Sequence, residues 1–305
     1  MPRARGQLSI AQTVLLLLLG LALLYGGVMF GAAIRMAAQG IPFERGLEQV
    51  TSEPFGPGMA QLFALGTVLL VGTRMAYGDR SLRAALQVRP VRMHVALLAI
   101  VAGLALHLPL VELMAVISDL APELALDEDA LRRLEDMTRI DGWVRAITVP
   151  LTVVAIAATT EELVFRGLLL PALRPRLGVA GAWVLTSLLF GVFHVTPFAA
   201  IYATIAGLVL GGIAIRTRSV LPCIAFHGAF NAVPLLLPQE VLPIEGLNVG
   251  ETDAHVPLPF VLAGLVIGVI ALVLLHRTTV PPAAGSHGNG SANDDDSANG
   301  NGSAH

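Results

Sequence analysis

The chain consists largely of long apolar stretches separated by short polar loops. A run of about 20 apolar residues is long enough to cross a bilayer as a helix, and runs of this length are not barrel strands. A chain in lipid must also satisfy its own backbone hydrogen bonds, which helices do internally. Such runs occur at about 9–33, 58–77, 93–118, 144–170, 179–195, 198–215, 220–237 and 258–275. We therefore predict an all-α, polytopic membrane protein with about eight transmembrane helices.

The composition agrees with a membrane location. Charged residues make up only 13% of the chain, whereas soluble domains usually carry about 25%. The charges are sorted by loop instead of forming one basic surface, so we expect the lipid bilayer and no nucleic acid as a partner. The single cysteine, Cys223, excludes an internal disulfide and a cysteine-rich metal site.

The arginines predict the orientation of the helices, because cytoplasmic loops of membrane proteins are enriched in basic residues. With eight helices, one side of the membrane receives Arg3, Arg5, Arg74, Arg80, Arg83, Arg89, Arg92, Arg174, Arg176, Arg216, Arg218 and Arg277. The loops on the opposite side are acidic. We therefore expect both termini to be cytoplasmic, in a bacterial inner membrane.

Three regions follow from this pattern. Residues 1–8 form a cytoplasmic N-terminus, and residues 9–277 form the transmembrane domain, with a catalytic core at about 144–237. Residues 278–305 are rich in glycine, asparagine, serine and aspartate, and such a composition predicts a disordered tail.

Three ionisable residues, Glu161, Glu162 and Arg166, lie inside the apolar run at 144–170. Each costs about 2.5–3.5 kcal/mol at the centre of a membrane helix, so we expect them to be paired, to face a wet cavity or to take part in chemistry. Glu162 and Arg166 are four residues apart and can pair on one helix face. Glu161 points about 100° away from Glu162, which leaves it available as a catalytic base.

Two later helices carry polar residues at the same spacing of four. Phe190 and His194 share a face of the fifth helix, and His227 and Asn231 share a face of the seventh. A carboxylate and an imidazole beside a water form a general-base pair for hydrolysis, and a second imidazole with an amide can stabilise an oxyanion. Two histidines and a glutamate could also bind zinc, but without a local His-Glu-x-x-His array the metal signal is weak.

The ordered set Glu-Glu-x-x-x-Arg, Phe-x-x-x-His and His-x-x-x-Asn resembles the CAAX-processing and bacteriocin-processing family of intramembrane glutamic endopeptidases. The resemblance covers residues of about 144–237. It implies hydrolysis of a peptide bond in a membrane protein or peptide, without a metal or other cofactor. By this analogy Glu161 and His194 activate water, and His227 and Asn231 stabilise the oxyanion. By the same resemblance, we expect Glu162, Arg166 and Phe190 to support the structure of the site.

Two other functions remain open from the sequence. The chain could be a catalytically silent scaffold or immunity factor that binds a partner peptide, or a proton-coupled transporter that uses the same buried groups as a relay. The polar positions show no inverted repeat of the kind found in many transporters. The predicted helix bounds also place His194 nearer the opposite side of the membrane than Glu161 and His227, so a tilted or late-starting fifth helix is needed to bring them together.

Overall fold

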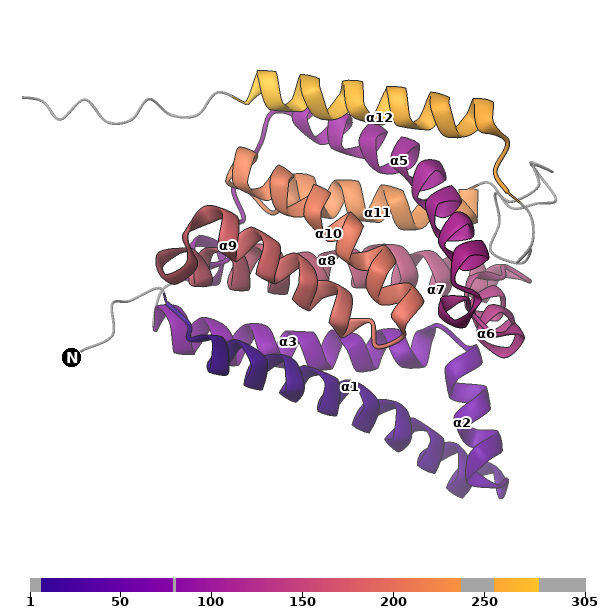
Figure 1. Cartoon of the computed structure of the whole chain (residues 1–305). Helices are drawn as coiled ribbons and strands as arrows, with labels where there is room; N and C mark the ends of the chain where they lie inside the picture. Colours follow the sequence, from indigo (N-terminus) through magenta and orange to yellow (C-terminus); the bar gives the residue numbers. More distant parts are fainter. Residues whose placement is uncertain (1–6, 79–80, 237–254, 280–305) are drawn as a thin grey trace, which may run out of the picture.

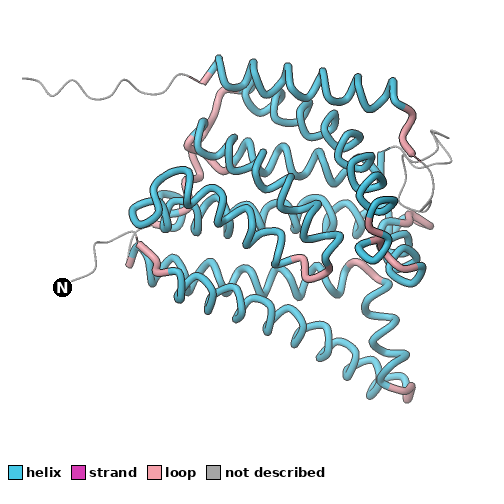
Figure 2. Tube along the Cα trace, in the orientation of Figure 1, coloured by secondary structure: helices cyan, strands magenta, loops and turns pink. Residues whose placement is uncertain are grey.

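The computed structural model describes residues 7–78, 81–236 and 255–279. Throughout these segments the chain is helical, with short connecting loops and no strand (Figure 2). The long helices lie alongside one another as a bundle (Figure 1). The prediction of an all-α membrane protein is confirmed. Most of the predicted N-terminal region and nearly all of the predicted tail lie outside the described residues.

Six helical segments in the described part of the chain are long and apolar enough to span a membrane. Five of them are single helices: α1 (Ile10–Gln39), α3 (Phe55–Tyr77), α5 (Met93–Leu120), α10 (Pro197–Thr217) and α12 (Leu258–Thr278). The sixth, Trp143–Phe193, has 51 residues, which is too long for one crossing. A shorter apolar helix, α11 (Leu221–Leu236), lies within the bundle as well.

The long segment consists of two passes that meet at Gly178. Its first pass contains α7 (Trp143–Val149), the π-helical turn η2 (Pro150–Ile156), α8 (Ala157–Glu162) and a second π-helical turn, η3 (Leu163–Leu169). The following helix, α9 (Leu170–Phe193), is broken at Gly178, where φ is 70° and ψ is −179°. Glycine adopts positive φ readily, and the chain turns back there (Figure 1). With these two passes and α11, the prediction of about eight helices is confirmed.

Short helices connect the passes: α2 (Phe43–Ser52), α4 (Leu82–Ala85), the 3-10 turn η1 (Pro122–Leu124) and α6 (Glu128–Thr138). In Figure 1, α2 and α6 lie at the right-hand end of the bundle, whereas α1 begins and α12 ends at the left-hand end. The right-hand end carries arginines as well as acids, and these are paired: Arg35 with Glu53 at 2.6 Å and Arg132 with Glu128 at 3.1 Å.

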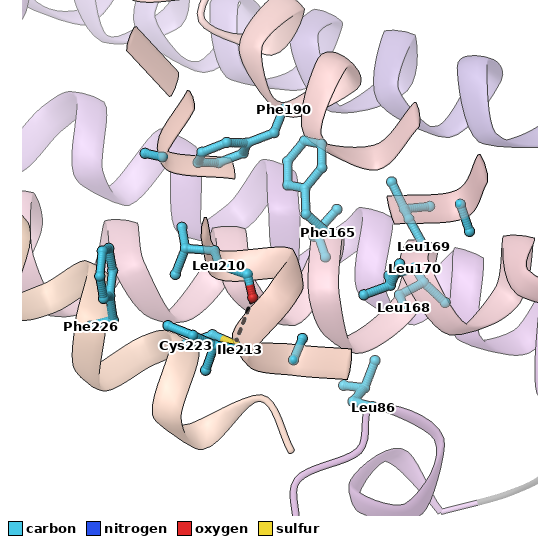
Figure 3. Packing of buried hydrophobic residues seen from close by; sticks show 14 of the residues in the cluster. Leu86, Phe165, Leu168, Leu169, Leu170, Phe190, Leu210, Ile213, Cys223 and Phe226 are labelled. Atoms are coloured by element: carbon cyan, nitrogen blue, oxygen red, sulfur yellow. Dashed lines mark hydrogen bonds between the residues drawn. The ribbon is translucent and has the colours of Figure 1, made fainter. Parts of the chain in front are cut away.

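The apolar core draws its buried side chains from η3, α9, α10 and α11 together with α1, α3, α5 and α12, and Figure 3 shows part of it. Phe165 and Phe190 pack edge to face, with ring centroids 5.0 Å apart. Cys223 is fully buried in this core, and its thiol donates a hydrogen bond to the carbonyl of Leu210. The core thus packs η3, which directly follows α8, against the later helices, and this packing positions the polar residues described next.

Candidate active site

Glu162 is completely buried and accepts two hydrogen bonds through the same oxygen. Arg166 Nη1 lies 2.9 Å from Glu162 Oε1, one helical turn along the same segment. His227 Nδ1, on α11, lies 2.9 Å from that oxygen as well. The predicted pairing of Glu162 with Arg166 is therefore present, and it extends to a histidine on another helix.

Arg166 is also buried and is held at three points. Besides the contact with Glu162, its Nη2 donates a hydrogen bond of 3.1 Å to the carbonyl of Gly207 on α10. Its guanidinium lies 4.3 Å from the ring centroid of Phe190, in cation–π contact. A Cβ added at Gly207 would lie only 3.1 Å from Arg166 Nη2, so glycine allows α10 to approach closely. Arg166 thereby links the helix of the two glutamates to α9 and α10.

Glu161 has a different environment from its neighbour. Its Oε1 accepts a hydrogen bond of 2.8 Å from Nε2 of Gln61, which lies on α3. Its Oε2 is buried and has no hydrogen-bond partner among the described residues. The nearest basic atom is His227 Nε2 at 3.9 Å, too far for a hydrogen bond. Glu161 therefore keeps one oxygen available as an acceptor, as its helical position predicts.

His227 lies between the two glutamates. Its Nδ1 donates to Glu162, because a carboxylate that already accepts from Arg166 has no proton to offer. This contact fixes the orientation of the ring and turns Nε2 toward Glu161. A histidine whose second nitrogen is held by a carboxylate is a common arrangement in active sites.

His194 follows the last residue of α9, and its Nδ1 is 2.8 Å from the carbonyl of Phe190. Since a carbonyl only accepts, Nδ1 carries the hydrogen, and Nε2 of the neutral ring is free to accept a proton. The second pass of α9, from Gly178 to Phe193, is short, at roughly 22 Å. His194 nevertheless lines the same cavity as Glu161 and His227, so the three residues meet despite the difference in depth expected from the sequence.

The structure brings the predicted residues to one cavity of about 90 Å³. Asn231 lines it, with its Nδ2 donating a hydrogen bond of 3.1 Å to the carbonyl of Val153. The polar lining residues are Glu161, His194, Tyr202, His227 and Asn231, and the others are Phe190, Ala203, Ala206, Leu210, Phe226 and Phe230. Glu162 and Arg166 lie behind this lining. Over the described segments, no group of three or more His, Cys, Asp or Glu side chains is arranged to hold a metal ion.

Two residues at the site are not anticipated by the sequence analysis. Gln61 contacts Glu161 directly, and Tyr202 lines the cavity. A glutamine inside the apolar run at 58–77 is itself a signal, since polar groups within a membrane helix need a partner. The sequence does not identify Glu161 as the partner of Gln61, because the two residues are 100 positions apart.

Residues 143–233 match the family model described as type II CAAX prenyl endopeptidase Rce1-like. The matched segment contains every residue of the three motifs, so the resemblance to the CAAX-processing family is confirmed over that segment. It ends before α12 and begins after α6, so α1, α3 and α5 lie outside it. No curated protein and no solved structure matches the chain.

Proposed function

Because residues 143–233 carry the pattern of the Rce1-like endopeptidases, we propose that this protein is an intramembrane glutamic endopeptidase. It hydrolyses a peptide bond in a membrane-associated protein or peptide. The observation that carries the proposal is the free Oε2 of Glu161 at a cavity lined by two imidazoles and an amide. Glu162 Oε2 is also buried without a partner among the described residues, but Glu162 does not line the cavity, so Glu161 is the carboxylate placed to act on a substrate.

In this mechanism Glu161 and His194 activate the attacking water. Glu161 Oε2 accepts one proton of the water as its oxygen attacks the carbonyl, and Nε2 of His194, which also lines the cavity, is the second acceptor. The proton taken up by Glu161 then passes to the leaving amine as the C–N bond breaks. Removal of a proton by a positioned base typically contributes about 10²–10⁴-fold to a hydrolysis rate. The low polarity of the cavity lining strengthens these contacts, because the surrounding phenylalanine and alanine side chains exclude bulk water.

His227 and Asn231 stabilise the oxyanion that forms at the scissile carbonyl. Asn231 has two amide hydrogens, of which one is used on the carbonyl of Val153, so the other is available. His227 donates from Nδ1 to Glu162 and, when protonated, also donates from Nε2 toward the cavity. Donors fixed in this way need no reorganisation during the reaction.

Glu162, Arg166 and Phe190 hold this arrangement in place. Glu162 fixes the ring of His227, Arg166 neutralises Glu162, and Phe190 contacts both the guanidinium and the ring of His194. These residues are positioning groups, since Glu162 and Arg166 are absent from the cavity lining and Phe190 has no polar side-chain atom. Both chain termini are cytoplasmic in this proposal, in a bacterial inner membrane, as the arginine distribution indicates.

The test is cleavage of a farnesylated peptide ending in Cys-aliphatic-aliphatic-X by the purified protein in liposomes. We expect one new C-terminus, identified by mass spectrometry, and the same product with the control Glu123→Gln, whose carboxylate is exposed at η1. The unprenylated peptide, run in parallel, shows whether the lipid group is recognised. Binding without cleavage by the wild type would identify a scaffold instead of an enzyme.

Treatment with a zinc chelator tests the metal-independent form of the mechanism. We expect an unchanged cleavage rate, because the proposed base and oxyanion donors are all side chains. Loss of activity that added zinc restores would replace this mechanism with a metal-dependent one.

A further inference from the structure

Helix α3 approaches the segment before the two glutamates closely at Gly58. A Cβ added at Gly58 of α3 would lie 2.5 Å from Cγ2 of Thr152 in η2, which no real pair of carbon atoms tolerates. Gln61 follows Gly58 by three residues and therefore lies on nearly the same face of α3. The close approach at Gly58 brings the amide of Gln61 within reach of α8.

The Gln61 amide is fixed by two neighbouring residues of α8. Its Nε2 donates to Glu161 Oε1 at 2.8 Å and lies 3.4 Å from Thr160 Oγ1. Thr160 donates its own hydrogen to the carbonyl of Ile156, so its oxygen is free to accept. A carboxylate offers only acceptors, so the amide must present its NH₂ group to Glu161. The orientation of Gln61 is thus determined by its contacts.

This contact makes the two oxygens of Glu161 unequal. Oε1 is occupied by Gln61, whereas Oε2 is buried without a partner among the described residues and lies on the side of His227. Without Gln61, the carboxylate plane would be free to rotate about the last side-chain bond, because that torsion is soft. A donor on one oxygen therefore fixes the plane of the carboxylate and, with it, the direction of the other oxygen.

We propose that Gln61 is a positioning residue for the reaction, which holds Glu161 Oε1 so that Oε2 faces the cavity. The inference rests on the proposed function, since it needs Glu161 to be the base. It adds a residue outside the segment matched by the family model, on a helix that lies more than 60 residues before that segment in the chain. By this proposal, α3 contributes a side chain to the active site and does not only pack against the other helices.

Gln61→Met tests the inference, because methionine has a similar shape and no hydrogen-bond donor. We expect kcat to fall by about 10- to 100-fold, the range associated with misplacing a reacting group by up to about 1 Å. KM should stay within about twofold, because Gln61 is absent from the cavity lining. The probe is the farnesylated peptide used for the wild type.

The matched control is Thr67→Val on the same helix. Within the described residues, the Thr67 hydroxyl donates to the carbonyl of Phe63 in its own helix, so the change removes a hydroxyl from α3 without touching the site. All rates are expressed per folded molecule, measured as the fraction of the single buried cysteine, Cys223, that resists a maleimide. A purely structural contribution of Gln61 lowers the folded fraction and leaves kcat per folded molecule unchanged, which would overturn the inference.

Gln61→Asn keeps a buried amide but shortens it, and serves if Gln61→Met does not fold. We expect the same loss of kcat, since the shorter side chain cannot span the distance to Glu161. Wild-type kcat in either folded variant refutes the positioning role while leaving the proposed function intact. Absence of cleavage by the wild type refutes the proposed function, and full cleavage by Glu161→Gln refutes the assignment of Glu161 as the base, so these failures are distinguishable from a failure of the positioning role.

Discussion

At the scale of single residues, the pair formed by Glu162 and Arg166 is sealed from solvent, with side chains 0% and 1% exposed. Two buried charges are stable together only when their geometry is good and their remaining hydrogen bonds are satisfied. Here Arg166 also bonds to Gly207 and Glu162 also bonds to His227, although Glu162 Oε2 has no partner in the described segments. Removing one member therefore leaves an uncompensated charge.

We predict that Arg166→Met lowers the free energy of unfolding by about 3–5 kcal/mol, because Glu162 is left buried and unpaired. The double variant Arg166→Met with Glu162→Gln should lose less free energy of unfolding than Arg166→Met alone. Thermal unfolding followed by maleimide labelling of Cys223 measures both. The control is Arg132→Met, whose pair with Glu128 has the same spacing on α6 but is exposed, and which should cost about 0.5 kcal/mol or less. Equal losses from the two arginine variants would contradict the argument.

The residues at the site differ in how far the sequence alone predicts their contacts. The pairing of Glu162 with Arg166 is predictable because it depends only on the local geometry of one helix. The same geometry correctly separates Glu161 from that pair. The contact from Gln61 depends on how α3 packs against α8, and helix periodicity carries no information about such packing between distant segments.

At the scale of helices, the contact between α3 and η2 at Gly58 sets the position of Gln61. We predict that Gly58→Ala reduces kcat in the same direction as Gln61→Met, because the added methyl group forces α3 away from Thr152. Gly66→Ala is the matched control, since a Cβ at this position of α3 meets nothing within 4 Å. Equal peptide-cleavage rates for the two alanine variants would show that the spacing of these helices is unimportant.

A second contact joins the start of α12 to the end of α5. His255 lies between two carboxylates, with Nδ1 2.9 Å from Glu112 and Nε2 2.9 Å from Asp119. The hydrogen bond to Glu112, followed by that to Asp119, raises the pKa of His255 above its usual value of 6.5. Because the folded-state pKa is the higher one, this contact stabilises the protein fully below about pH 6.5. The stabilisation is lost as the pH rises through the folded-state value.

We therefore predict that His255→Gln lowers the melting temperature at about pH 6 and has little effect at about pH 9. Melting curves of the wild type and the variant across this range provide the measurement. A difference that grows with pH would have the wrong sign for a protonated histidine between two carboxylates.

The predicted helix ends agree with the structure where a helix-breaking residue marks them. They fail where no such residue is present. Gly178 separates two predicted helices and is the point at which α9 turns back. In contrast, the apolar length of the run does not predict the π-helical turns η2 and η3 on either side of α8, although η2 begins at Pro150 and η3 contains Arg166. Such wide turns often accompany functional sites. They are set by the packing of the surrounding helices.

At the scale of the whole molecule, the described start and end of the chain lie at the same end of the bundle (Figure 1). The number of passes follows from apolar length, which is why the sequence predicts it well. The meeting of α3, α8, α9 and α11 around one cavity involves contacts of long sequence separation. The motifs predict which residues matter, but only the packed helices show that their side chains share a site.

The orientation prediction is tested by fusing green fluorescent protein to each terminus in turn. Both fusions should fluoresce in a bacterial host, because this reporter folds in the cytoplasm and the arginine-rich loops favour that side. A fluorescent fusion at only one terminus would contradict an even number of passes, and two dark fusions would reverse the orientation.

The most direct test of the central claim compares kcat/KM for the farnesylated peptide between the wild type and Glu161→Gln. Glutamine has the shape of glutamate but cannot take a proton from water, so we predict a loss of at least about 100-fold. The folded fraction, measured by protection of Cys223, should stay close to that of the wild type. Wild-type cleavage by folded Glu161→Gln would contradict the assignment of Glu161 as the base.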